Sequence, residues 1–200
     1  MKKMAGMLFS TNFNYRIMTR IHILSSTDRP GSNALNVSAY ASGLLSRYAE
    51  TEVFSLEDYP LADVAGGKYG NTPQSVQDYN SRILDADGFL FVIPEYNGSF
   101  PGVLKVFIDY LPFPKALEKR PVSLIGESSG SFGALRAVEQ FEQILKYRKA
   151  YIFPERMFIQ RVDKNFDVQT GLSSELHQKL FEKQLKEFPE FVESLTKQLV

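Results

Sequence analysis

The stretch GFLFVIPEYNGSFPGVLKVFIDY, residues 88–110, carries the strongest fold signal in the chain. Residues 88–93 form an unbroken apolar run rich in β-formers, which is typical of a strand buried on both faces of a parallel sheet. A polar turn follows at residues 94–99. A helical pattern comes next, with Ser99 as its expected N-cap and Pro101 just inside. The stretch therefore predicts a strand–loop–helix junction of the kind at which open α/β sheets bind ligands.

Apolar strands and helical patterns alternate along the rest of the chain. Further strands are expected at residues 20–26, 51–56, 120–126 and 151–153, with an extension of the last to residue 159 left open. Helices are expected after Ser32, from Pro73, from Gly133 and after Ser173 or Ser174, and Pro189 should kink or restart the last one. Five such alternations predict a three-layer α/β/α domain with a parallel, doubly wound sheet.

Composition narrows the classes of function. With 44% hydrophobic and 23% charged residues in a chain of 200, one globular domain is expected. Lys+Arg and Asp+Glu balance at 23 each, which argues against nucleic acid as a partner. The chain has no cysteine, its two histidines lie far apart, and no apolar run reaches the roughly 20 residues that span a bilayer. We expect a cytoplasmic protein without a metal site or a membrane segment.

Residues 1–19 form a separate part of the sequence. Their apolar patch, residues 4–9, is too short for an export signal and is followed by polar residues. We expect a flexible N-terminal extension here, and a single ligand-binding domain over residues 20–200.

The loop after the first strand, SSTDRPGSN at residues 25–33, lacks the G-x-G-x-x-G pattern of dinucleotide sites. Hydroxyls, backbone amides and a helix N-terminus can still surround a phosphate. The donors we select are Ser26, Thr27, Ser32 and Asn33, with Arg29 as a charged contact. A plain polar turn with a serine N-cap explains this loop equally well.

The loop after the fourth strand, GESSGSFG at residues 126–133, has three glycines, which permit close approach to a flat ligand. A tight strand-to-helix turn explains it equally well. The loops after strands one, three and four would meet at the switch point of a sheet of order 2-1-3-4-5, where flavodoxin-like folds hold FMN. This convergence weighs more than any single loop.

The central motif, PEYNGS at residues 94–99 with PG at 101–102, LK at 104–105 and ID at 108–109, closely resembles the signature of the NADPH-dependent FMN reductase family. The first loop, and the third loop followed by LRA at residues 135–137, are similar to their counterparts in that family. The resemblance covers residues 20–195. It implies a flavodoxin-like domain that passes hydride from NADPH or NADH to bound FMN and then to an acceptor such as free flavin, a quinone or an azo compound.

The resemblance also implies roles for individual residues. The FMN phosphate would be held by the first loop, the ribityl chain and ring by the second, and the other edge of the ring by the third. No side chain is assigned as a catalytic acid or base, because the flavin carries the chemistry. Tyr96 and Phe132 either stack on the ring or form an aromatic wall. The residues assigned to FMN are Ser26, Thr27, Arg29, Ser32, Asn33, Pro94, Glu95, Tyr96, Asn97, Gly98, Ser99, Ser128, Ser129, Gly130 and Phe132.

Several alternatives stay open at this point. An electron-carrying flavodoxin or a non-catalytic flavin-binding protein would share the fold, although carriers are typically acidic and this chain is neutral. The acceptor and the choice between NADH and NADPH are undecided. The resemblance implies a homodimer, with a homotetramer as the alternative, through the helices at residues 103–111 and 135–147. Its candidate contacts, for each of which core packing is the alternative, are Phe107, Tyr110, Phe141 and Tyr147.

Overall fold

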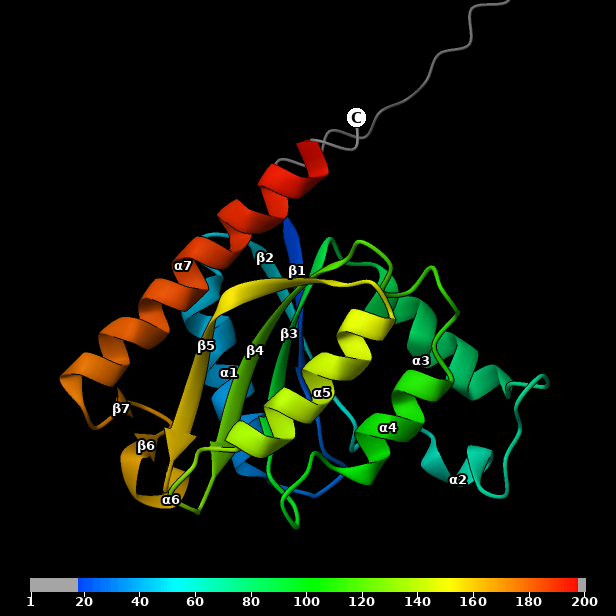
Figure 1. Ribbon diagram of the computed structural model, residues 1–200, viewed down its shortest axis with the longest axis horizontal. Helices are drawn as coiled ribbons and strands as arrows, with labels where there is room; N and C mark the ends of the chain where they lie inside the picture. Colours follow the sequence, from blue (N-terminus) through cyan, green and yellow to red (C-terminus); the bar gives the residue numbers. More distant parts are fainter. Residues whose placement is uncertain (1–17, 198–200) are drawn as a thin grey trace, which may run out of the picture.

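The computed structural model describes residues 18–197, which are built around one five-stranded sheet (Figure 1). Every strand pair in this sheet is parallel. In spatial order the strands are β2 (Glu50–Ser55), β1 (Arg20–Ser25), β3 (Gly88–Pro94), β4 (Pro121–Ser128) and β5 (Tyr151–Gln160). The predicted flavodoxin-like fold and strand order are confirmed. The extension predicted at residues 1–19 lies almost wholly outside the described residues and stays a prediction.

Helices cover both faces of the sheet, as parallel crossover connections require. One face carries α1 (Asn33–Leu45) and α7 (Glu175–Lys197), and the other carries α3 (Gln74–Leu84), α4 (Gly102–Asp109) and α5 (Leu135–Tyr147) (Figure 1). The predicted Ser32 N-cap of α1 is confirmed, because its hydroxyl accepts a hydrogen bond from Leu35 N at 3.1 Å. The segment between β2 and α3 contains one short helix, α2 (Leu61–Val64).

The central strand divides the apolar core into two layers. All residues of β3 are buried, as its unbroken apolar run predicted. Phe89, Phe91 and Ile93 belong to the layer beneath α3, α4 and α5, whereas Leu90 and Val92 belong to the layer beneath α1 and α7. Successive side chains of a strand point to opposite faces, so one apolar run supplies both layers.

The start of α4 differs from the expectation. Pro101, rather than Ser99, stands at the N-cap, and no side chain caps this helix. Ser99 Oγ instead donates a hydrogen bond to Gln140 Oε1 at 2.6 Å. The expected Ser99 cap is wrong because residues 96–99 form a tight turn of their own, which ends before the helix begins.

The C-terminal part also departs from the expectation at one point. α7 runs through Pro189 as a single helix, so the expected restart does not occur. Phe188 and Val192, on either side of the proline, are fully buried, and this packing offsets the lost backbone hydrogen bond. Before α7, a one-turn helix α6 (Val162–Asn165) leads into an antiparallel hairpin of β6 (Phe166–Asp167) and β7 (Gly171–Leu172). The segment between α6 and α7 is therefore a small hairpin.

His22 is a buried residue of the sheet, as its place in the first strand predicted. Its Nδ1 lies 2.8 Å from the carbonyl oxygen of Ile83. Burial lowers the pKa of His22, so the neutral imidazole is favoured. The side chain therefore serves packing rather than chemistry.

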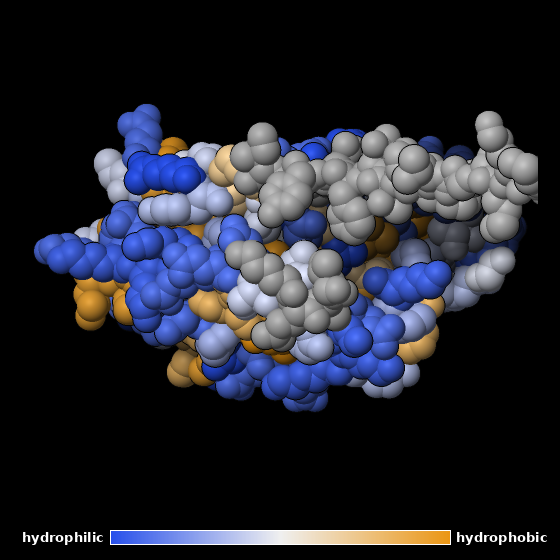
Figure 2. All heavy atoms as spheres, turned by 90° about the horizontal axis from the view of Figure 1, so that it is seen from above, coloured by the Kyte–Doolittle hydropathy of each residue, from blue (hydrophilic) through white to orange (hydrophobic). Residues whose placement is uncertain are grey.

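The surface at the end of the molecule where the strands begin is mainly hydrophilic (Figure 2). The hydrophobic residues that are visible on it are scattered among hydrophilic ones. Within residues 18–197, no helix has the length and apolar character needed to cross a bilayer.

Candidate functional site

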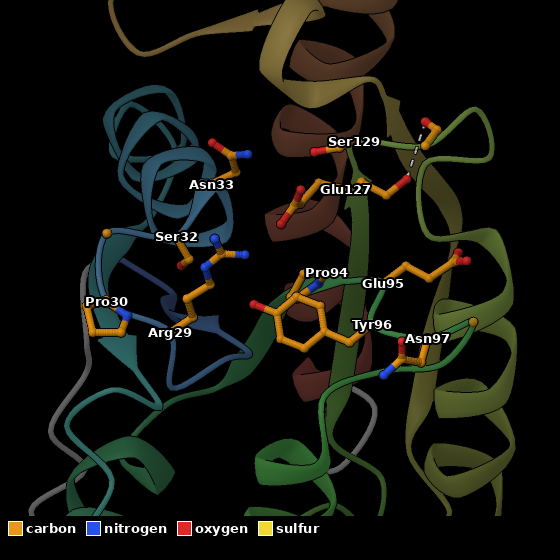
Figure 3. A pocket seen from close by; sticks show the side chains of 14 residues that line it. Arg29, Pro30, Ser32, Asn33, Pro94, Glu95, Tyr96, Asn97, Glu127 and Ser129 are labelled. Atoms are coloured by element: carbon orange, nitrogen blue, oxygen red, sulfur yellow. Dashed lines mark hydrogen bonds between the residues drawn. The ribbon is translucent and has the colours of Figure 1, made fainter.

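Three loops meet at the carboxyl-terminal edge of the sheet, after β1, β3 and β4 (Figure 3). They enclose a pocket of about 530 Å³, a size typical of small-molecule sites. β1 and β3 are neighbours in the sheet, and the chain leaves them toward opposite edges, which makes this the topological switch point. The pocket is lined by Arg29, Pro30, Gly31, Ser32, Asn33, Pro94, Glu95, Tyr96, Asn97, Gly98, Glu127, Ser128, Ser129 and Gly130.

The first loop brings the N-terminus of α1 to the pocket. The amides of a first helical turn have no acceptor within the helix, and the helix dipole makes this end positive. Ser32 and Asn33 stand at this end, and Arg29 lies on the same side of the pocket (Figure 3). A positive helix end, a hydroxyl and a guanidinium together suit a phosphate group.

The second loop is a tight turn. Tyr96 N donates to Ser99 O at 2.8 Å, and Ser99 N donates to Tyr96 O at 3.1 Å. Between them Asn97 and Gly98 have φ values of +52° and +77°, the pattern of a type I′ turn, for which Asn-Gly is a preferred pair. Gln140 Nε2 on α5 donates to Gly98 O at 3.2 Å. The turn is therefore held rigidly against α5.

Two side-chain contacts tie the second loop to its neighbours. The hydroxyls of Tyr96 and Thr27 lie 2.9 Å apart, which joins the second loop to the first. Arg136 Nη1 on α5 lies 3.4 Å from Glu95 Oε1, while Glu95 Oε2 is buried and has no hydrogen-bond partner among residues 18–197. One oxygen of the Glu95 carboxylate thus serves a local contact with α5.

Two of the three glycines in the third loop serve packing rather than ligand approach. A Cβ on Gly126 would lie 2.5 Å from Gly133 O, and a Cβ on Gly133 would lie 2.9 Å from the backbone of Phe158. Gly130 alone of the three lines the pocket. The expectation that all three allow close approach to a ligand is therefore wrong, because the neighbouring strand β5 occupies the space.

The structure brings most of the predicted site residues together. Arg29, Ser32 and Asn33, the run from Pro94 to Gly98, and the run from Ser128 to Gly130 all line the pocket. Four of the assigned residues lie outside its lining. Ser26 and Thr27 are buried residues at the start of the first loop. Ser99 bonds to α5, and Phe132 is exposed with Arg136 over its ring at 4.5 Å.

Sequence reasoning missed three lining residues, Pro30, Gly31 and Glu127. Pro30 and Gly31 fall inside the predicted first loop, so the prediction of that loop was enough to include them in the site. Glu127 is different, because it is the seventh residue of β4 and pairs in register with Pro94. Since Pro94 begins the predicted second loop, a correct register between strands three and four would have placed Glu127 beside it.

Glu127 is the most perturbed acid of the pocket. Only 4% of its surface is exposed. Burial raises its pKa from 4.5 to about 7, and the nearby Arg29 offsets this in part. Near neutral pH this carboxyl therefore exists in both the neutral and the ionised form.

The fold and the pocket together define a flavodoxin-like protein with a nucleotide site at its switch point. The model of the NADPH-dependent FMN reductase family matches residues 19–163, and the chain belongs to this family. It is accordingly an FMN-dependent NAD(P)H oxidoreductase, as the central motif predicted.

Individual relatives agree with this assignment. An NAD(P)H-dependent FMN reductase of Pseudomonas aeruginosa is 33% identical over 137 residues, which cover 63% of this chain and 74% of that protein. A quinone reductase of Escherichia coli is 36% identical over 120 residues, covering 58% of this chain and 64% of that protein. The flavoenzyme NAD(P)H:(acceptor) oxidoreductase of Paracoccus denitrificans superposes with a TM-score of 0.71 at 23% identity, covering 89% of this chain and 98% of that one, and supports the fold.

The residues present fit FMN. The Arg29 guanidinium, the Ser32 hydroxyl and the first amides of α1 are the donor set that a phosphate requires. Gly98 and Gly130 also line the pocket, and because glycine has no side chain a ligand can approach the backbone at these two positions. Among residues 18–197, no group of three or more His, Cys, Asp or Glu side chains is arranged to hold a metal ion.

Proposed function

We propose that this chain transfers hydride from NADPH or NADH to a small planar acceptor, a quinone first of all, with free flavin and azo compounds as further acceptors. Bound FMN supplies the redox chemistry, because it accepts hydride from the nicotinamide and passes the electrons on. Quinones come first because several of the relatives are named quinone reductases, among them one from Escherichia coli and one from a Burkholderia species.

The protein's own residues bind and orient the cofactor in this proposal. Arg29, Ser32 and Asn33 hold the phosphate, the turn at residues 94–98 fixes the middle of the cofactor, and residues 128–130 border its other edge. Residues outside the lining act through these: the Thr27 hydroxyl positions Tyr96, and Ser99 positions the turn through Gln140. Ser26 in the first loop and Phe132 in the third complete the assigned set, although neither lines the pocket. No side chain is needed as an acid or base.

One observation carries the proposal. Three loops that are far apart in the sequence converge on one pocket at the switch point, and one of them presents a helix N-terminus with an arginine beside it. Open α/β sheets bind their ligands at this position, and such a helix end suits the phosphate of FMN.

The test is an absorption spectrum of the purified protein, followed by steady-state oxidation of NADPH and NADH with benzoquinone. We expect a flavin spectrum after addition of FMN, and quinone-dependent turnover above the background without enzyme. A colourless protein that takes up no FMN would refute the proposal. FMN binding without nicotinamide turnover would favour the electron carrier instead.

Replacing Asn97 with alanine is expected to weaken FMN binding several-fold without unfolding the domain. Asn97 lines the pocket at φ +52°, and alanine tolerates this left-handed conformation less well than asparagine, at a cost of about 1 kcal/mol. Quenching of FMN fluorescence measures the affinity, and the thermal midpoint measures folding. Asn97→Gly is the matched control, because it keeps the turn and removes only the side chain. Unchanged affinity in both variants would remove Asn97 from the site.

We further propose that the chain forms a homodimer, with a homotetramer as the alternative, through α4 and α5. Of the four expected contacts only Tyr147 is available to a second subunit. Phe107, Tyr110 and Phe141 are buried in this chain's own core, whereas Tyr147 and Phe113 are 74% and 64% exposed and flank a groove between the two helices. Large exposed aromatic side chains are typical of subunit contacts. A monomeric mass by light scattering would contradict this proposal.

The cytoplasm is the location that fits this proposal. The nicotinamide donors are available there, and a chain without cysteine makes no use of an oxidising compartment.

A further inference from the structure

Glu127 is a buried acid without a partner in the pocket. Its side chain points from the end of β4 into the space between the first and second loops (Figure 3). Its backbone is satisfied, since its carbonyl oxygen accepts from Glu95 N at 3.2 Å. No hydrogen bond joins its carboxyl group to residues 18–197, and only 4% of the residue as a whole is exposed. Buried polar groups are ordinarily paired, so this carboxyl is available to a ligand.

The surroundings of Glu127 hold too little positive charge to keep its pKa at the ordinary value of a carboxyl group. Burial is the main influence and raises its pKa to about 7, against the opposing effect of Arg29 on the first loop. On the second loop Glu95 is a further acid and Tyr96 is engaged with Thr27. Further charged groups near this end of the sheet include Asp28 on the first loop and Arg136 on α5, which pairs with Glu95. Arg161 follows β5, with Asp163 and Lys164 next to it in α6.

The chemistry of FMN favours the neutral form of such a group. FMN presents phosphate oxygens and ring carbonyl and nitrogen atoms, most of which accept hydrogen bonds. A protonated carboxyl can donate to these atoms, whereas a carboxylate can only accept. A phosphate bound nearby adds negative charge, which further disfavours the carboxylate.

We propose that Glu127 is an FMN-binding residue that acts as a neutral acid, so that the protein takes up a proton at Glu127 when FMN binds. This inference rests on the proposed function, because it requires FMN in this pocket.

The direction of the pH dependence follows from linkage. In the free protein Glu127 loses its proton near pH 7, and in the complex it loses the proton only at higher pH. Below this pH range Glu127 is protonated in both the free protein and the complex, so it adds no pH dependence to the FMN affinity. As the pH rises through this range, binding must first restore the proton, so the affinity falls. Glutamine at position 127 is always neutral and removes this dependence.

The experiment compares FMN dissociation constants of the wild type and Glu127→Gln by fluorescence quenching from pH 6 to pH 9. The ratio of the two constants cancels the ionisation of the FMN phosphate itself. We expect the dissociation constant of the wild type, divided by that of Glu127→Gln, to be constant near pH 6 and to have risen about tenfold by pH 9. Glu175→Gln is the matched control, because Glu175 is an exposed acid at the start of α7, paired only with Lys179. The FMN dissociation constant of Glu175→Gln should equal that of the wild type at every pH of the series.

A second measurement needs no variant. Calorimetry of FMN binding at pH 8, in buffers of different ionisation enthalpy, should show the wild type taking up about 0.4 of a proton, the uptake that matches a tenfold change in the ratio by pH 9. A ratio that stays flat while both proteins bind FMN, or uptake near zero, would overturn the inference and leave the proposed function intact. A ratio that changes in the opposite direction would show that Glu127 binds as a carboxylate and would also overturn it. Failure of both proteins to bind FMN at every pH would instead overturn the proposed function.

Discussion

Alanine at position 126 is expected to destabilise the protein by about 3 kcal/mol, the largest stability effect among the substitutions considered. The new Cβ would lie 2.5 Å from Gly133 O, 3.0 Å from Phe158 Cδ1 and 3.1 Å from Val138 Cγ2. The first of these contacts is with backbone, which cannot rotate away as a side chain can. β4 is hydrogen-bonded to β3 and β5 on either side, so the strand cannot shift without disturbing its pairing. The midpoint and slope of urea unfolding measure the loss.

The control for Gly126→Ala is a glycine-to-alanine substitution at a position where the added Cβ has room. Gly43 lies inside α1, and a Cβ there would meet nothing within 4 Å. Gly43→Ala should therefore stabilise the protein by up to about 1 kcal/mol, since alanine favours the helix and restricts the unfolded chain. The two substitutions thus have opposite expected signs. Equal effects at both positions would contradict the packing described for the third loop.

Loss of the Arg29 side chain is expected to raise the dissociation constant for FMN about 10-fold to 100-fold. Arg29 lines the pocket beside the N-terminus of α1, where a phosphate fits. A charge-assisted hydrogen bond to phosphate contributes about 1.5–3 kcal/mol, which corresponds to that range of affinity. Arg29→Ala should also leave folding unchanged, because its side chain is exposed. Titration of flavin fluorescence measures the affinity.

Riboflavin provides the sharper comparison, because it lacks only the phosphate of FMN. Its affinity should be the same for the wild type and for Arg29→Ala. Arg47→Ala is the matched protein control, since it removes the same charge from an exposed site after α1, away from the pocket. An equal loss of FMN and riboflavin affinity in Arg29→Ala would show that Arg29 contacts the ring or holds the loop, and not the phosphate.

Local sequence patterns predicted the elements well, because each pattern depends on neighbouring residues. The apolar run at residues 88–93 became the fully buried β3, and Ser32 caps α1 as its position predicted. The strand order followed from five alternations of strand and helix together with loops that resemble one family. The parts of the site carried by contiguous loop residues, such as the turn at Asn97 and Gly98, were likewise predicted from the sequence.

The errors concern residues whose roles depend on distant partners. Phe107 and Phe141 were candidates for a subunit contact, yet they are buried in this chain, because a helical stripe looks the same whether a sheet or a second subunit covers it. Ser99 has the chemistry of a helix cap, but Gln140 on another helix engages it. Gly126 and Gly133 have the freedom to approach a ligand, but β5 fills the space that they leave.

The amino-acid sequence by itself was therefore enough to predict a parallel α/β sheet with loops suited to FMN. Periodicity and loop composition are properties of adjacent residues, so they can be read without the tertiary structure. The tertiary structure alone decided which side chains share the pocket. Pairing of Pro94 with Glu127 across β3 and β4 places an acid at the edge of the switch point, and packing from other elements buries it. Its raised pKa arises from that burial, a property that no local stretch of sequence contains.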